Sequence, residues 1–241
     1  MSNFLLVHGG LHGGWCWDRV VPLLQARGHE VRALDLPGSD RRTPAAEVTF
    51  DTYRDATVAA VMQAAEPPIL VGHSLGGRTI SIAAETAPDR IRALVYLAAI
   101  LPALDRGKNP QPDPDNIIAK AFFPADDGLS LMVPYEAARA GFYSDCSEED
   151  AKAAFSRVVP QPTLAVTTPV CLTAANWGRV PRHYIYTTKD LTVPIAMQRA
   201  MVELSPCAST HEIPSGHSPF LNHPGMVADI LCEIARTPAT V

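Results

Sequence analysis

Residues 68–77 read PILVGHSLGG: an apolar run is followed at once by a Gly-x-Ser-x-Gly pattern with Ser74 at its centre. A serine that stands where a buried strand ends and a helix begins is held out of the backbone towards a neighbouring base. Only small residues fit on either side of such a sharp turn. The Leu75 backbone N–H then lies at a helix N-terminus, where negative charge is stabilised. The stretch therefore predicts a strand–turn–helix unit that presents a nucleophilic serine and an oxyanion donor.

The rest of the chain has the pattern of a doubly wound parallel sheet. Short apolar runs are predicted to form strands at residues 3–8, 30–35, 69–73, 91–99, 183–188 and 210–214. Amphipathic stretches alternate with them and are predicted to form helices at residues 18–27, 50–65, 75–87, 195–204 and 224–235. Because short apolar strands that alternate with helices are typical of parallel sheets covered on both faces, we expect an α/β fold.

Residues 102–178 interrupt this alternation. The segment is irregular and rich in proline, and a structureless loop of this length is rare in a compact domain unless it has a function. Its apolar residues argue against a disordered linker, the other interpretation of such a segment. We therefore expect a core domain formed by residues 1–101 and 179–241 and a cap inserted between them. The cap should lie over the carboxyl ends of the strands, where ligands bind in open α/β sheets.

Apolar side chains of the inserted segment are candidates for a substrate pocket. The candidates are Phe122, Phe123, Leu131, Met132, Phe142 and Trp177. Ordinary packing of the cap onto the core domain is the competing interpretation for each of them.

A serine nucleophile needs a base, and the base needs an orienting acid. In a sheet of this kind both should follow strands near the C-terminal end of the chain, with the acid before the base. Asp190 lies in KDLTVP, directly after the strand predicted at 183–188, and is the preferred acid. Asp105, which follows the strand at 91–99, is the alternative, whereas Asp35 precedes the serine and is interpreted as a loop-forming residue.

Position selects the base among the eight histidines of the chain. His217 lies in the glycine-containing loop PSGHSP, after the last predicted strand, and is the predicted base. His73 flanks the serine, but its side chain is expected to point away from it. His223 precedes the last helix, where a capping role is expected.

A second oxyanion donor is expected in the loop that follows the first strand. That loop reads HGGLHGGW at residues 8–15, and the Gly10 N–H is the candidate that would act together with the Leu75 N–H. A tight turn that requires a positive φ is the other reason for a glycine at this position. The two roles are compatible, because glycine also allows the backbone to approach a site closely.

Several motifs together carry a family resemblance: HGG at residues 8–10, HGGWCW at 12–17, DLPG at 35–38 and GHSLGG at 72–77, with Asp190 and His217. The chain resembles the α/β-hydrolase superfamily over nearly its whole length. Within it, the chain is most similar to the branch that contains plant methylesterases, plant hydroxynitrile lyases and bacterial arylesterase relatives. The resemblance implies a six-stranded, all-parallel sheet with a cap. It also implies Ser74 as nucleophile, His217 as base, Asp190 as acid, and Gly10 and Leu75 as oxyanion donors.

Two positions depart from the lyases of that branch, in which a lysine follows the catalytic histidine and a threonine occupies the position of Gly9. Here Ser218 and Gly9 stand instead, so neither a cation for the leaving cyanide nor a hydroxyl for the cyanohydrin is present. The sequence therefore predicts an esterase that cleaves small aryl or methyl carboxylic esters through an acyl-enzyme on Ser74. The alternatives are a hydroxynitrile lyase or other cofactor-free reaction on the same scaffold, and a ligand-binding receptor with slow turnover.

Composition and charge limit the classes of binding partner and the cellular compartment that we expect for this protein. A net charge of −5 without a long basic run argues against nucleic acid, and no apolar stretch is long enough for a membrane span. The N-terminal residues carry no signal-peptide pattern, and the five scattered cysteines include no Cys-x-x-Cys. We therefore expect a cytoplasmic enzyme that needs no metal and no cofactor. The expected partner is a small ester, and a homodimer remains an open alternative.

Overall fold

The computed structural model describes residues 1–110 and 116–237, and its centre is a six-stranded parallel sheet with the order β2-β1-β3-β4-β8-β9. The strands are β1 (Asn3–Val7), β2 (Glu30–Leu34), β3 (Ile69–His73), β4 (Ala93–Leu97), β8 (Arg182–Thr187) and β9 (Ser209–Ile213). All five strand pairs are parallel. The predicted α/β fold is thereby confirmed, and the predicted strands end within two residues of the observed bounds.

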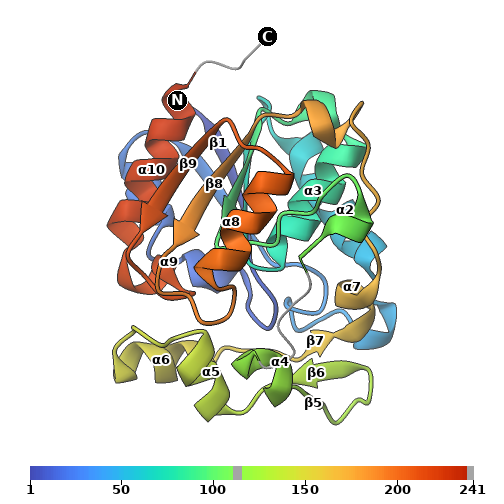
Figure 1. Ribbon diagram of the computed structural model, residues 1–241, viewed down its shortest axis with the longest axis vertical. Helices are drawn as coiled ribbons and strands as arrows, with labels where there is room; N and C mark the ends of the chain where they lie inside the picture. The colour runs from blue at the N-terminus through green and yellow to red at the C-terminus, as the bar shows by residue number, and fades with distance from the viewer. Residues whose placement is uncertain (111–115, 238–241) are drawn as a thin grey trace.

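Helices cover both faces of this sheet (Figure 1). The covering helices are α1 (Val21–Ala26) and α10 (Pro224–Arg236) on one face, and α2 (Phe50–Gln63), α3 (Gly76–Thr86) and α8 (Ile195–Leu204) on the other. The alternation of side chains along β1 explains the two cores. Phe4 and Leu6 pack with α1 and α10, whereas Leu5 and Val7 pack with α2, α3 and α8. Each strand of the sheet centre is thus buried on both sides.

Shorter elements complete the body of the molecule. They are the 3-10 helices η1 (Gly14–Trp17), η2 (Ala45–Glu47), η3 (Pro88–Arg90), η4 (Arg106–Lys108) and η5 (Trp177–Arg179), and the short helix α9 (Pro219–Asn222). The helix predicted at 18–27 begins only at Val21, because η1 and a turn occupy the residues before it. None of the helices in residues 1–110 and 116–237 has the length and apolar character that crossing a membrane would require.

The chain forms a cap between β4 and β8. Its elements are α4 (Ile117–Ala121), β5 (Phe123–Pro124), β6 (Ser130–Met132), α5 (Tyr135–Gly141), α6 (Glu148–Phe155), β7 (Gln161–Pro162) and α7 (Thr163–Thr167). The strands β5, β6 and β7 form a small antiparallel sheet. In Figure 1 the arrowheads of β8 and β9 point towards the cap, which therefore lies at the carboxyl ends of the large sheet. Its buried side chains Ile118, Ala138 and Val158 share one hydrophobic core with β1 and α10.

The last part of the predicted insertion packs on the body and not in the cap. Glu85 of α3 accepts hydrogen bonds from the backbone N–H groups of Thr173 and Trp177. Trp177 is fully buried and donates its indole N–H to the Tyr96 hydroxyl at 3.0 Å. The Arg182 guanidinium lies 4.3 Å from the Trp177 ring, and Arg182 begins β8. Trp177 therefore lies near the amino ends of the strands, opposite Ser74, and its predicted place in a substrate pocket is wrong.

The turn between β3 and α3 requires glycines, because its backbone lies in direct contact with neighbouring backbone atoms. A Cβ atom at Gly72 would lie 2.7 Å from the Gly76 carbonyl oxygen, and one at Gly76 would lie 2.6 Å from the His8 carbonyl oxygen. A Cβ at Gly77 would lie 2.3 Å from the carbonyl oxygen of Ile100. Because backbone atoms cannot move aside as a flexible side chain can, glycine is required at all three positions.

We expect Gly77→Ala to lower the free energy of unfolding by about 1–3 kcal/mol or more, since the new methyl group would push α3 away from the chain after β4. Gly225→Ala is the matched control. Gly225 lies in the first turn of α10, and a methyl group added there would have nothing within 4 Å, so the substitution should be neutral or stabilise by up to about 1 kcal/mol. Urea denaturation of the three proteins measures both effects, and equal midpoints for Gly77→Ala and wild type would contradict this account of the turn.

Candidate active site

Ser74 occupies the sharp turn between β3 and α3 in a backbone conformation that side chains avoid. Its φ is +51°, in the left-handed region that is uncommon for residues other than glycine. Two backbone hydrogen bonds hold it there: the Ser74 N–H donates to the Leu97 carbonyl at 3.3 Å, and the Ile100 N–H donates to the Ser74 carbonyl at 3.0 Å. The end of β4 and the chain that follows it thus impose a conformation that costs about 1–3 kcal/mol and that aims the hydroxyl out of the turn.

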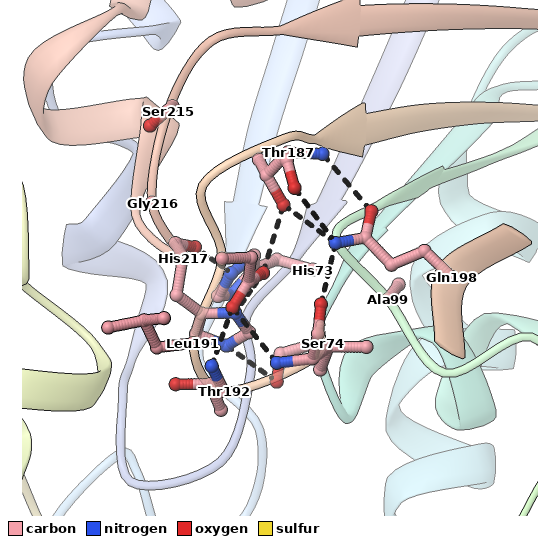
Figure 2. Close-up of polar contacts among 12 residues, drawn as sticks. His73, Ser74, Ala99, Thr187, Leu191, Thr192, Gln198, Ser215, Gly216 and His217 are labelled. Carbon is pink, nitrogen blue, oxygen red and sulfur yellow. Dashed lines mark hydrogen bonds and ion pairs between the residues drawn. The ribbon is translucent and has the colours of Figure 1, made fainter. Parts of the chain in front are cut away.

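The hydroxyl of Ser74 lies against the imidazole of His217 (Figure 2). The other side of that imidazole contacts the carboxylate of Asp190. His217 Nε2 lies 3.0 Å from Ser74 Oγ, and His217 Nδ1 lies 2.8 Å from Asp190 Oδ2. All three side chains are buried. A carboxylate only accepts hydrogen bonds, so Nδ1 carries the ring proton and Nε2 turns its lone pair to the serine. The structure therefore brings together the three residues in the order that their positions after β3, β8 and β9 predict.

The carboxylate of Asp190 is held by the loop that follows β8. Its Oδ1 accepts from the N–H groups of Thr192 (2.8 Å) and Val193 (2.9 Å), and its Oδ2 accepts from the Thr187 hydroxyl at 2.9 Å. The buried Gln198 amide of α8 bonds to Thr187 (Figure 2). The same amide donates to the Val193 carbonyl. These bonds fix the direction of the carboxylate towards the base.

The other candidate acids have different roles. Asp105 is exposed, accepts from the Gly107 N–H at 3.1 Å and lies 3.6 Å from the Lys108 ammonium group. Asp35 accepts from the Gly14 N–H at 2.7 Å, which fits its interpretation as a loop-forming residue. The structure thus brings Asp190 to His217 and leaves Asp105 on the surface.

The glycine loop after β1 lies against the serine turn. A Cβ at Gly9 would lie 2.8 Å from the Ser74 Cβ, and one at Gly10 would lie 2.7 Å from the Leu75 Cδ1. Gly10 has no positive φ, so a tight turn is not the reason for this glycine. The atom nearest to that added Cβ is the end of the Leu75 side chain, so Gly10 lies against Leu75 in the folded chain.

Two histidines to which the sequence patterns assign no role fix this loop. His8 Nδ1 lies 2.8 Å from the Gly9 carbonyl oxygen, and His12 Nδ1 lies 2.8 Å from the Gly10 carbonyl oxygen. Because a carbonyl only accepts, both Nδ1 atoms carry a proton. Burial lowers the pKa of His8 and lowers that of His12 to about 3, so both rings are neutral at neutral pH. The repeated HG in HGGLHGG was the signal that could have found them.

His73, whose side chain is expected from the sequence to point away from Ser74, contacts His217. Its Nε2 donates to the His217 backbone carbonyl at 2.8 Å, and the two ring centroids are 4.6 Å apart. Burial lowers the pKa of His73 well below its ordinary value, which keeps the ring neutral. His223 precedes α10 but its side chain makes no capping bond, so the expectation of a cap at that position is wrong.

Of the predicted pocket residues in the cap, Phe142 lies closest to the described chemistry: its ring stacks on His217 with centroids 5.8 Å apart. Phe122 and Phe123 are exposed on the cap surface, and Leu131 and Met132 are partly buried in β6. A narrow cavity of about 10 Å³ adjoins Gly10 and Leu75. Side chains of α2 and of the β7–α7 region line it: Phe50, Tyr53, Gln161, Ala165 and Val166. Sequence reasoning missed them because these segments meet the loop only in the folded chain.

Within residues 1–110 and 116–237, no group of three or more His, Cys, Asp or Glu side chains is arranged to hold a metal ion.

Because burial lowers the pKa of His12, the free energy of unfolding should depend on pH. The folded-state pKa of about 3 lies below the unfolded value of about 6.5, so the unfolded chain binds the extra proton between these values. The stabilisation is complete above the unfolded pKa and is lost as the pH falls towards about 3. We expect the unfolding free energy of wild type to fall more steeply in this window than that of His12→Asn, by up to about 1.4 kcal/mol per pH unit. Asparagine can still donate to the Gly10 carbonyl, and parallel urea-denaturation curves for the two proteins between pH 4 and 7 would contradict the expectation.

Comparison with known proteins supports the same fold and family. The model of the alpha/beta hydrolase family matches residues 4–230. Pyrethroid hydrolase of Sphingobium wenxiniae is 32% identical over 256 residues, which cover 99% of this chain and 89% of that protein. Salicylic acid-binding protein 2 of Nicotiana tabacum is 33% identical over 254 residues, which cover 98% of this chain and 97% of that protein.

A solved structure agrees over the whole chain. The crystal structure of a pyrethroid hydrolase from Sphingobium faniae superimposes with a TM-score of 0.86 at 30% identity, and the match covers 99% of this chain and 98% of that one. The resemblance inferred from the motifs is confirmed. The family match spans both the sheet and the cap, and the protein belongs to the alpha/beta hydrolase family.

Proposed function

We propose that the protein is a serine hydrolase that cleaves small carboxylic esters of the aryl or methyl type through an acyl-enzyme on Ser74. The observation that carries the proposal is the buried chain of hydrogen bonds from Ser74 Oγ through His217 to Asp190, at 3.0 and 2.8 Å. The names of the relatives, which include pyrethroid hydrolase and several esterases, support it.

Acylation begins when an ester carbonyl comes to rest beside Ser74. His217 Nε2 takes the hydroxyl proton as the serine oxygen attacks the carbonyl carbon, and Asp190 stabilises the imidazolium that forms. The carbonyl oxygen becomes an oxyanion that the Gly10 and Leu75 N–H groups receive, at the N-terminus of α3. When the tetrahedral intermediate collapses, the C–O bond to the alcohol breaks and His217 returns the proton to the leaving oxygen.

Deacylation repeats these steps with water. His217 takes a proton from the water molecule, and the hydroxide attacks the acyl carbon at the same oxyanion site. The bond to Ser74 breaks, the serine oxygen regains its proton from His217, and the carboxylic acid leaves.

Crowding at Gly9 favours hydrolysis over cyanohydrin cleavage. A Cβ at this position would lie 2.8 Å from the Ser74 Cβ and 2.9 Å from His73 Nδ1. A threonine side chain therefore has no room beside the serine unless the loop moves. Ser218, at the position of the lyase lysine, is buried and carries no charge. At this position the chain therefore offers no cation to receive a leaving cyanide.

The proposal includes a reducing, cytoplasmic setting. All five cysteines lie within the described residues and are free thiols, as is usual where disulfides are kept reduced.

Ser74→Ala should abolish hydrolysis of every ester in a panel of aryl acetates, aryl methyl esters and lactones, because the remaining groups have no nucleophile to activate. Initial rates and labelling of intact protein by a fluorophosphonate probe measure this. Near wild-type hydrolysis of p-nitrophenyl acetate by Ser74→Ala would overturn the assignment. If the wild-type protein released cyanide from mandelonitrile, the lyase alternative would be favoured. If wild type were acylated once per molecule without turnover, the ligand-binding receptor would be favoured.

Asp190→Asn should lower kcat by up to about 10⁴, since the amide would no longer hold His217 in the required tautomer. Asp105→Asn is the matched control: Asp105 also follows a strand of the sheet but is exposed, and its substitution should leave kcat within about twofold. Steady-state kinetics on p-nitrophenyl acetate distinguish the two. A larger loss in Asp105→Asn would show that the acid has been assigned to the wrong residue.

A further inference from the structure

The residue after Gly10 is held in a conformation that its side chain disfavours. Leu11 has a φ of +64°, in the left-handed region where a branched side chain crowds its own backbone. Leu11 is buried, and both of its backbone groups are bonded to the cap. The N–H donates to Gln161 Oε1 at 3.1 Å, and the carbonyl accepts from the Val159 N–H at 2.9 Å. The cap segment around β7 therefore imposes this conformation on the loop.

Together with His8 and His12, Gln161 fixes the orientation of two successive peptide groups by hydrogen bonds. His8 holds the carbonyl of the Gly9–Gly10 peptide. In a trans peptide the N–H lies opposite the carbonyl, so the Gly10 N–H points away from His8. His12 holds the carbonyl of the next peptide, and Gln161 holds its N–H. Gly10 lies between the two fixed planes, and its N–H cannot rotate independently of them.

Gln161 is itself held in place. It is 5% exposed, and its Nε2 donates to the Tyr53 hydroxyl at 3.1 Å and to the Pro162 carbonyl at 3.3 Å. Tyr53 belongs to α2, so the amide bridges the cap, a helix of the body and the glycine loop. A buried amide whose donor and acceptor are both hydrogen-bonded holds the elements that it connects at fixed relative positions.

We propose that Gln161 is a positioning residue for the oxyanion hole: its amide holds the left-handed Leu11 and thereby aims the Gly10 N–H at the oxyanion formed on Ser74. The inference rests on the proposed function and adds a residue from the cap to its catalytic geometry. It assigns Gln161 to stabilisation of the transition state, and not to binding of the ground-state ester.

Gln161→Met tests this, because methionine has a similar volume but neither accepts from Leu11 nor donates to Tyr53. Complete removal of an oxyanion donor costs about 10²–10³ in kcat, so a misplaced donor should cost about 10-fold or more. KM should stay within about threefold, since ground-state binding does not use the bond. Stopped-assay kinetics on p-nitrophenyl acetate, run well below the unfolding midpoint of each protein, give both constants.

An inhibitor pair supplies a readout that general loosening of the fold would not produce. An aryl trifluoromethyl ketone adds reversibly to Ser74 Oγ and forms a hemiketal whose oxyanion occupies the hole, whereas the matching methyl ketone binds as the carbonyl. The inhibition constant of the trifluoromethyl ketone should rise in Gln161→Met by the factor that kcat/KM falls. The inhibition constant of the methyl ketone should not change.

Two further variants complete the design. Tyr53→Phe keeps the bond from Leu11 and removes one anchor of the Gln161 amide, so it should show the same pattern with a smaller loss. It also replaces Gln161→Met if that variant does not fold. Asp150→Asn is the control: it removes the charge that pairs α6 of the cap with Arg19 of the body, and it should leave both inhibition constants unchanged.

The outcomes are distinct. Unchanged affinity for the trifluoromethyl ketone in Gln161→Met, or equal losses for both ketones, would overturn the role of Gln161 while wild type still binds covalently. A wild-type protein that forms no hemiketal at Ser74 would overturn the proposed function, and the inference with it.

Discussion

The structure of the site depends on the close approach of two backbones, at the start of α3 and at the end of β1. Gly76 packs directly on the His8 carbonyl, with no room for a methyl group between them. This contact allows Ser74 to sit in a strained turn, and it brings the loop that begins at Gly9 alongside the serine. The two backbone segments that carry Gly10 and Leu75 therefore meet at this contact, and neither segment can shift there without the other. The Ser74 side chain therefore stands on a backbone whose position this contact fixes.

Much of this arrangement could be predicted from the sequence because it depends on strand ends. In a parallel sheet the carboxyl ends of all strands meet at one edge, so residues directly after β3, β8 and β9 were expected to meet there, and Ser74, Asp190 and His217 do. The placement of Trp177 failed for a physical reason. An apolar residue in a proline-rich segment is equally compatible with a cap and with a core, and only the folded chain shows it beside Tyr96. The bond from Leu11 to Gln161 joins residues 150 positions apart, a separation for which neither periodicity nor spacing carries a signal.

The cap contacts each of the loops on which the proposed chemistry depends. Asn116 donates to the Thr192 carbonyl in the loop of the acid, and Asp145 accepts from the Gly216 N–H in the loop of the base. Gln161 accepts from the Leu11 N–H in the loop that carries Gly10, the proposed oxyanion donor. A cap that only covered a pocket could vary freely in sequence. This cap is hydrogen-bonded to the loops that follow β1, β8 and β9, so we expect substitutions in the cap to shift the residues that the proposed chemistry uses.

The pairing of β4 with β8 has a consequence for how the chain assembles. The two strands are neighbours in the sheet, from Leu94 beside Arg182 to Leu97 beside Ile185, although the whole cap lies between them in the chain. The first four strands of the sheet can pair as soon as they are synthesised, but one edge of β4 stays open until β8 arrives. An apolar strand with an open edge can pair with another chain. The rate at which the cap folds and delivers β8 therefore determines how long newly made protein is exposed to aggregation.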